Sequence, residues 1–156
     1  MATQKLAAGG VSSWTNLFNS SDINSLASGS SVLSSIQIDN TGALDLMLDV
    51  SFNLGAVTVG AGAPSLSLFL AILNEDGSTY GDGLFASQAA GSPSSAYLVR
   101  AWTFVASNAY SPLVGSATGI VLPRQKFKCY LLNSLGATLN SSGNVIDYQT
   151  TNYTVA

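Results

Sequence analysis

Apolar and polar residues alternate along most of this chain with a period of two. The pattern is clear in "SSVLSSIQI" (30–38), "ALDLMLDVSF" (43–52) and "KFKCYLLNS" (126–134). Side chains of a β-strand point alternately to its two faces, so this period predicts strands with one buried face. The same pattern predicts strands over 65–73, 96–106, 113–123 and 144–155, which brings the chain to about seven or eight short strands.

Turn signals separate these segments. In "DNTG" (39–42), Asn and Gly stand where a tight turn between two strands needs them. Strands do not alternate with helices, which argues against an α/β fold. We therefore expect an all-β chain that folds as a jelly-roll-like antiparallel β-sandwich with one short N-terminal helix. Apolar residues on both faces of 65–73 predict a central strand.

The N-terminal part of the chain carries the helical candidate, "SSDINSLASG" (20–29). Ser20 or Ser21 can cap such a helix, Asp22 suits its first turn, and Gly29 can end it. Residues 1–13 are small and polar, and they are expected to form an arm. The expected organisation is therefore an N-terminal arm and short helix over 1–29, followed by a β-sandwich domain over 30–156.

Few residues of the chain are charged. Charged residues make up 8% of the 156 residues and the formal net charge is −3, whereas about 25% is usual in soluble domains. Only Arg124, Lys126 and Lys128 cluster among the basic residues, too few for a nucleic-acid-binding stripe. The longest apolar run, "LFLAIL" (68–73), is too short to span a membrane, and the N-terminus lacks the apolar segment of a signal peptide. A soluble protein made in the cytoplasm is expected.

The residues that most enzymes use are missing from the sequence. The chain has no histidine and one cysteine, Cys129, which alternates in phase with Phe127 and Leu131 and is expected to be buried. No G-x-S-x-G motif occurs, and without histidine the usual catalytic triad is excluded. We therefore expect a protein that is not an enzyme and needs no cofactor or metal.

Two carboxylates, Asp45 and Asp49, lie in "ALDLMLDVSF" and raise the question of a paired site. Four residues apart in one strand, they would stand roughly 13 Å apart at about 3.3 Å per residue. The paired carboxylates of glycosidases are about 5–9.5 Å apart. A catalytic pair is therefore not expected, and the face that carries Asp45, Met47 and Asp49 is interpreted as solvent-exposed or as a contact surface.

Two further segments are candidates for binding. The acidic stretch "NEDGSTYGDG" (74–83) resembles a calcium loop only loosely, and a solvated turn is the expected structure. Trp14, Leu17 and Phe18 precede the first expected strand of the sandwich. We interpret them as an anchor, either back onto the sandwich or onto a neighbouring molecule. Together with Asp45, Met47 and Asp49 they form the predicted interface.

Several phrases of the chain resemble small structural proteins of tailed bacteriophages. They are "WTNLFNSSDINSLASGSSVLSS" (14–35), "LNEDGSTYGDG" (73–83), "GIVLPRQKFKCYLLNSLGATL" (119–139) and "SSGNVIDYQTTNYTV" (141–155). These four segments cover most of the chain in the same order as in that group. The resemblance consists of short sequence phrases and includes no catalytic motif. The resemblance implies a virion component made in the host cytoplasm. It also implies a capsid decoration (cement) protein with a jelly-roll fold, which forms homotrimers on the capsid surface and binds the major capsid protein.

Other functions remain open at the level of sequence. The same resemblance fits a collar, tail or baseplate component. A carbohydrate-binding module for host attachment would use aromatic residues on the sandwich as a stacking platform. An enzyme such as a hydrolase would need Glu75, Asp76 or Asp82 close to Asp45, Asp49 or Asp147, and it is the least favoured of these hypotheses.

Overall fold

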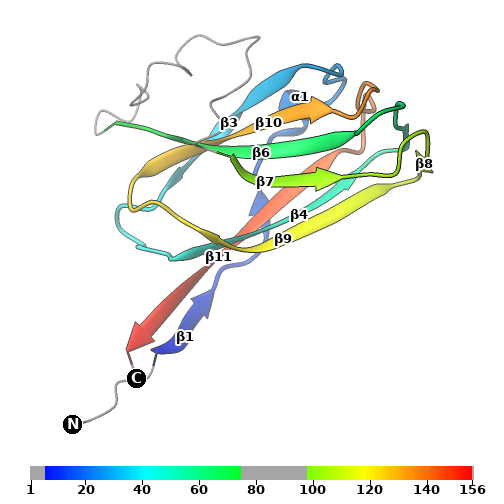
Figure 1. Cartoon of the computed structure of the whole chain (residues 1–156). Coiled ribbons are helices and arrows are strands. Elements are labelled where there is room, and N and C mark those ends of the chain that lie inside the picture. Colours follow the sequence, from blue (N-terminus) through cyan, green and yellow to red (C-terminus); the bar gives the residue numbers. More distant parts are fainter. Residues whose placement is uncertain (1–5, 75–97, 156) are drawn as a thin grey trace.

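The chain folds into two antiparallel β-sheets that face each other, as Figure 1 shows. The structure is a computed structural model and describes residues 6–74 and 98–155. The first sheet contains β1 (Leu6–Val11), β2 (Thr15–Asn16), β4 (Met47–Leu54), β9 (Leu113–Val121) and β11 (Val145–Val155). The second sheet contains β3 (Ser31–Asp39), β6 (Ser65–Ile72), β7 (Leu98–Thr103) and β10 (Lys126–Ser134).

Strands that are distant in sequence pair within each sheet. The first sheet has the order β1-β11-β4-β9, with β2 also paired to β11, and the second has the order β3-β10-β6-β7. All of these pairs are antiparallel. A further pair joins β5 (Val57–Thr58) to β8 (Ala109–Tyr110). The prediction of an all-β antiparallel sandwich is confirmed.

The strands with the clearest alternation lie where the sequence predicts them. The expected segments 30–38, 126–134 and 144–155 correspond to β3, β10 and β11 almost residue for residue. The expected strand over 65–73 is β6, and its central position between β10 and β7 is confirmed. Residues 75–97, which include most of the acidic stretch 74–83, lie outside the described part of the chain.

The N-terminal region differs from the expected arm and helix. Residues of β1 and β2 pair with β11, so this segment is part of the first sheet and a boundary at residue 29 does not separate two units. The helix α1 (Ser20–Ile23) is four residues long instead of extending to Gly29. Asn19 is its N-cap residue, and the Asn19 backbone N–H donates to the carboxylate of Asp22. The chain leaves the helix at Asn24, whose backbone is extended.

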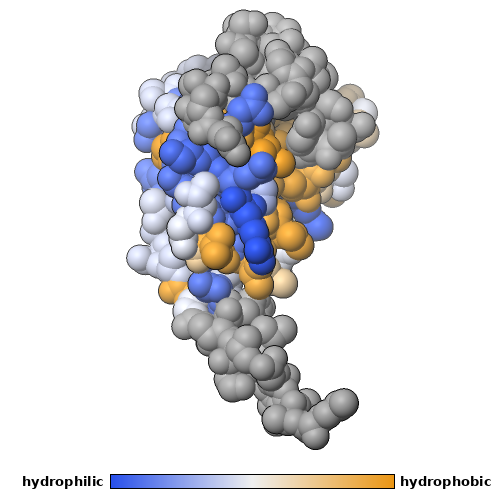
Figure 2. Space-filling model, turned by 90° about the vertical axis from the view of Figure 1, so that its left-hand side faces the viewer, coloured by the Kyte–Doolittle hydropathy of each residue, from blue (hydrophilic) through white to orange (hydrophobic). Residues whose placement is uncertain are grey.

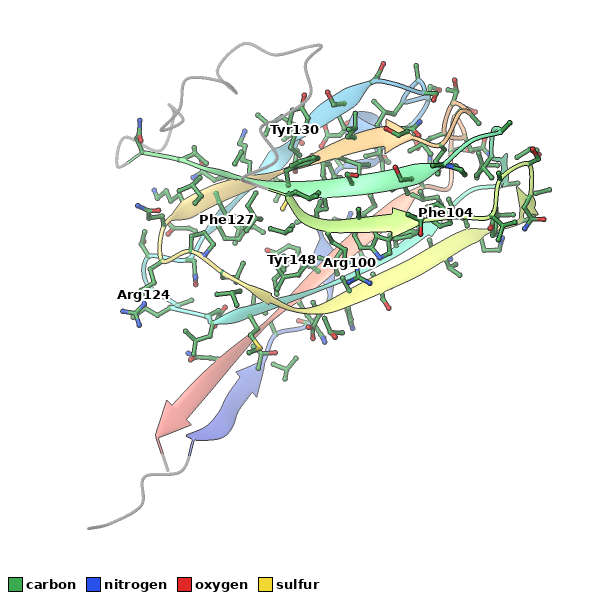
Figure 3. All side chains as sticks on the ribbon, in the orientation of Figure 1. Arg100, Phe104, Arg124, Phe127, Tyr130 and Tyr148 are labelled. Atoms are coloured by element: carbon green, nitrogen blue, oxygen red, sulfur yellow. The ribbon has the colours of Figure 1, made fainter. Side chains whose placement is uncertain are left out.

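The core lies between the two sheets. Leu48, Val50 and Phe52 of β4 are buried against Phe127 and Leu131 of β10 in one apolar cluster. Figure 3 shows Phe127 and Tyr148 between the sheets. The cluster also takes in the helix through Ile23, which is fully buried. This packing explains why the short helix persists, since four residues cannot form a stable helix alone.

A second buried apolar cluster lies on the outer side of the second sheet. Phe69 and Ala71 of β6 pack there with Leu73, which follows the strand, and with Tyr130 of β10, and the Ser31 hydroxyl hydrogen-bonds to Tyr130. Figure 3 shows Tyr130 on the opposite side of β10 from Phe127. Both faces of β6 are therefore buried, as the apolar residues on both sides of this segment indicate.

Candidate functional site

The outer face of the first sheet is the candidate contact surface, because it carries Met47 and Asp49 of the predicted interface. Cross-strand partners share a face, so the register of β4 with its two neighbours defines this surface. Its residues are Met47, Asp49, Ser51 and Asn53 of β4, Val145, Asp147, Gln149 and Thr151 of β11, and Val114, Ser116 and Val121 of β9. We call this set the outer face.

Asp49 is held in place by two hydrogen bonds. Its carboxylate accepts one from the Gly119 backbone N–H at 2.9 Å and one from the Gln149 side-chain amide at 3.2 Å. Gly119 has a φ of +70° and sits where the pairing of β4 with β9 shifts register. Asp49 therefore stabilises a β-bulge in β9, a structural role that leaves the carboxylate only partly free for a partner.

Asp45 lies outside the strand, contrary to the prediction of one strand over 43–52. β4 begins at Met47, and Leu44 has a φ of +51°. The buried side chain of Asn40 holds the loop, since it accepts from the Asp45 N–H at 2.7 Å and donates to the Asp45 carbonyl at 2.9 Å. The distance argument from strand geometry therefore does not apply to Asp45.

The two aspartates nevertheless lie in different environments. Burial raises the pKa of Tyr148 above its ordinary value, and the negative charge of Asp45 adds to the increase. Asp45 lies in the loop before β4, where its backbone N–H and carbonyl are hydrogen-bonded to the side chain of Asn40. Asp49 faces outward with Gln149. The structure therefore does not bring Asp45 and Asp49 together as a pair.

Asp147 is a feature of the outer face that sequence reasoning did not select as a contact. One of its carboxylate oxygens, Oδ1, is buried and has no hydrogen-bond partner. Asp147 lies opposite Ser51 on one side and opposite Asn16 of β2 on the other. An unsatisfied buried polar atom is destabilising, so the presence of a charged residue here is not explained by folding alone.

Exposed apolar side chains accompany these polar groups. Val121 is 73% exposed and Val114 is 59% exposed, both on the outer face, and Trp14 is 48% exposed beside the same sheet. The alternation of apolar and polar residues in 113–123 places Val114 on the outer face. Gly119 lies at a shift in register, so Val121 also faces outward although simple alternation from Val114 would place it inward. Figure 2 views an end of the sandwich and shows hydrophilic side chains in its middle with apolar ones gathered to one side.

Leu17 and Phe18 belong to the core rather than to a contact surface. They are 1% and 2% exposed, and both lie in the main apolar cluster. The backbone N–H of Leu17 donates to the Ile146 carbonyl at 2.7 Å, and its carbonyl accepts from the Ser34 hydroxyl at 2.7 Å. As the alternative interpretation expected, they anchor the N-terminal segment to the sandwich, so their place in the predicted interface is corrected.

An ion pair and a small hollow lie at one end of the sandwich. Lys126 pairs with Asp39 at 3.5 Å, while the Thr41 hydroxyl and backbone N–H donate to Asp39 and lower its pKa, with Lys126 adding to the effect. A hollow of about 210 Å³ lies beside them and is lined by Thr41, Leu73, Asn74, Arg124, Gln125 and Lys126. Figure 3 shows Arg124 at this end of the molecule.

The described residues gather no group of side chains that could hold a metal ion. Within residues 6–74 and 98–155, no three His, Cys, Asp or Glu side chains lie close enough together to hold a metal ion. Cys129 is buried, and burial raises the pKa of its thiol, which makes it unreactive in the native state. The acidic stretch 74–83, apart from Asn74, lies outside the described residues, and so do the contacts of Glu75, Asp76 and Asp82.

Aromatic side chains mostly pack against one another. Trp102 and Phe104 both meet the ring of Phe52 edge-on, at centroid distances of 5.1 Å and 6.4 Å, and Phe104 also meets Tyr110 at 5.8 Å. Trp14 is the most exposed aromatic side chain in the described part of the chain. A stacking platform for sugars needs exposed rings, so Trp14 is the one described residue that suits it well.

Comparison of the chain with protein-family models, with curated proteins and with solved structures finds no match. The one described helix, α1, has four residues, far too few to cross a membrane. The outer face therefore has to be interpreted from its own chemistry. It combines neutral polar groups, the exposed valines Val114 and Val121, and the carboxylates of Asp49 and Asp147.

Proposed function

We propose that this protein is a structural component of a bacteriophage virion, a capsid decoration (cement) protein that binds the major capsid protein across capsomer junctions. The observation that supports this proposal best is the outer face of the first sheet, where Val114, Val121 and Met47 lie among neutral polar groups. The resemblance of the sequence to small phage structural proteins supplies the biological setting.

The proposed mechanism is binding alone. Burial of Val114 and Val121 against a partner would remove apolar area from water, and Ser51, Asn53 and Gln149 offer hydrogen bonds around them. Each such contact is modest. Capsid symmetry repeats it many times, and a trimeric protein engages several sites at once, so avidity provides the overall affinity.

We also propose that the sandwich is a jelly roll. The support for this is the strand order, in which strands from the two ends of the chain pair in sequence toward its middle. β1 pairs with β11, β3 with β10, β4 with β9, and β6 with β7. Such nested pairs, distributed over two sheets, arise when one long antiparallel ribbon rolls up, which is how two Greek keys form an eight-stranded jelly roll.

Rebinding to capsids that lack the protein tests this function. Wild-type protein is expected to co-sediment with such capsids, and Val121→Lys is expected to bind at least tenfold more weakly because it places a charge on the proposed contact. Val105→Lys is the matched control, since Val105 is 70% exposed but lies outside the first sheet. Failure of the wild-type protein to bind would contradict the proposal. Equal binding by the two variants would show that the outer face is not the surface that contacts the capsid.

Two alternatives have their own expected outcomes. Antibody labelling of intact particles at the neck or tail, with unlabelled heads, would favour a collar, tail or baseplate component. A carbohydrate-binding module would use the exposed ring of Trp14. For that function, glycan-array binding should be present in the wild-type protein and lost in Trp14→Ala.

A further inference from the structure

Two strands near the ends of the chain form a ribbon that extends beyond the sandwich. β1 pairs with the last part of β11, from Leu6 opposite Val155 to Val11 opposite Thr151. Figure 1 shows this ribbon projecting from the body of the molecule. We call β1 and residues 152–155 of β11 the terminal ribbon.

The terminal ribbon has two edges without a neighbouring strand. β4 follows β11 only as far as Met47, which lies opposite Thr151, so residues 152–155 pair with β1 alone. On the other side, β1 pairs with β11 alone among the strands of the described chain. Isolated two-stranded ribbons are marginally stable in water, because three strands or a supporting apolar layer are needed.

Neither edge carries the residues that usually prevent pairing with another molecule. No charged residue and no proline occurs between Leu6 and Ser21, or between Tyr148 and Ala156. Exposed edge strands are normally protected from pairing with another molecule by lysine, by proline or by charged side chains that point inward. A single irregularity between Ala8 and Gly10 interrupts the pairing of β1 with β11. The ribbon is thus an open and uncharged template for further strands.

We propose that the terminal ribbon joins copies of this chain, with the free edge of β1 in one copy pairing with the free edge of residues 152–155 in the next. Each copy carries one edge of each kind. A closed ring of copies therefore pairs every edge, whereas a different partner on one edge would leave the other open. The low charge of the chain, −3 over 156 residues, opposes this association only weakly. This contact would hold together the trimer of the proposed function, and the inference rests on that proposed trimer.

The mass of the purified protein in solution tests this inference without capsids. Wild-type protein should have three times the chain mass by light scattering. A truncated chain that begins at Val11 should have the mass of one chain, because the free edge of β1 is removed. The bond from the Ser12 N–H to the Thr150 carbonyl is retained, so the sandwich should keep its melting temperature within a few degrees.

A second variant covers the case in which truncation disturbs folding. Ala7 and Thr154 stand opposite each other in the ribbon, and the double variant Ala7→Lys with Thr154→Lys places two like charges there in each copy. It should also have the mass of one chain. Val105→Lys is the matched control and should keep the wild-type mass, since it adds an exposed charge outside the ribbon.

Each result separates this inference from the proposed function. If both ribbon variants keep the wild-type mass, the ribbon is not the contact between copies, while the capsid function is untouched. If wild-type protein has the mass of one chain, self-association is wrong, and capsid rebinding still decides the function. If such single chains bind capsids and truncation abolishes that binding, the ribbon pairs with the capsid protein and the inference is overturned.

Discussion

At the scale of single residues, close contacts decide which substitutions the sandwich tolerates. Gly115 of β9 lies against the ring of Phe52, and a Cβ atom at Gly115 would be 2.3 Å from Cζ of that ring. Phe52 is itself fixed by the edge contacts with Trp102 and Phe104. Glycine suits position 115 because a Cβ atom there would overlap the Phe52 ring unless the ring or the backbone shifts.

Gly115→Ala should lower the free energy of unfolding by about 1–3 kcal/mol, the usual effect of overpacking a core. The measurement is urea denaturation followed by tryptophan fluorescence. Gly42→Ala is the matched control, because no atom lies within 4 Å of a Cβ at that position. Its stability should stay close to wild type, and an equal loss in both variants would contradict the packing argument.

Two carboxylates on the outer face differ in their hydrogen bonding. Asp49 and Asp147 both lie on the outer face, and their sequence contexts do not distinguish them. Asp49 is satisfied by Gly119 and Gln149, whereas Oδ1 of Asp147 is buried without a partner. The strand register supplies hydrogen-bond donors to one carboxylate and none to Oδ1 of the other, and this difference arises from neighbours that are distant in the sequence.

At the scale of elements, one side chain closes an open side of the sandwich. β7 and β9 are the last strands of their sheets, and they lie on the same side of the molecule. The indole N–H of Trp102 in β7 donates to the Ser116 carbonyl in β9 at 2.9 Å. This bond links the two sheets and covers part of the β9 edge, which protects it from pairing with another strand.

Trp102→Phe should lower the free energy of unfolding by about 1 kcal/mol, the net value of one hydrogen bond, because the ring contact with Phe52 is retained. Thermal and urea denaturation provide the measurement. Trp14→Phe is the control: Trp14 is 48% exposed, and its substitution should change stability by less than about 0.5 kcal/mol. A larger effect at Trp14 than at Trp102 would contradict the role of the Trp102–Ser116 bond.

At the scale of the whole molecule, apolar burial and hydrogen bonds dominate over charge. One ion pair, Lys126 with Asp39, occurs among the described residues, and both side chains are partly exposed. Exposed pairs contribute little to stability. The core, in contrast, runs the length of the sandwich and includes Cys129, which is 1% exposed.

Cys129 provides a probe of global unfolding. Because its thiol is buried and burial raises its pKa, a thiol reagent such as 5,5′-dithiobis(2-nitrobenzoate) should not modify the native protein at neutral pH within minutes. In denaturant, one thiol per chain should react at once. The native reaction rate should follow the rate of opening of the core, and fast reaction of the folded protein would contradict the buried position.

The sequence by itself determined where most strands lie and which side chains they bury. Alternation with a period of two is a local property, so β3, β10 and β11 were predictable almost to the residue, and Cys129 and Phe127 were predictable as core residues. The contrast between buried Leu17 and Phe18 and exposed Trp14 was not predictable, because all three are apolar residues in one short segment that lacks regular alternation.

Only the tertiary structure decided how the strands pair, and with it the outer face and the terminal ribbon. Leu6 lies opposite Val155, and β4 joins β11 and β9 from distant parts of the chain. "LAAGGV" has no strand pattern of its own and is a strand because β11 offers it an edge. Asp45 leaves the strand because Asn40 hydrogen-bonds its backbone. Both results depend on contacts between segments, and local periodicity carries no information about such contacts.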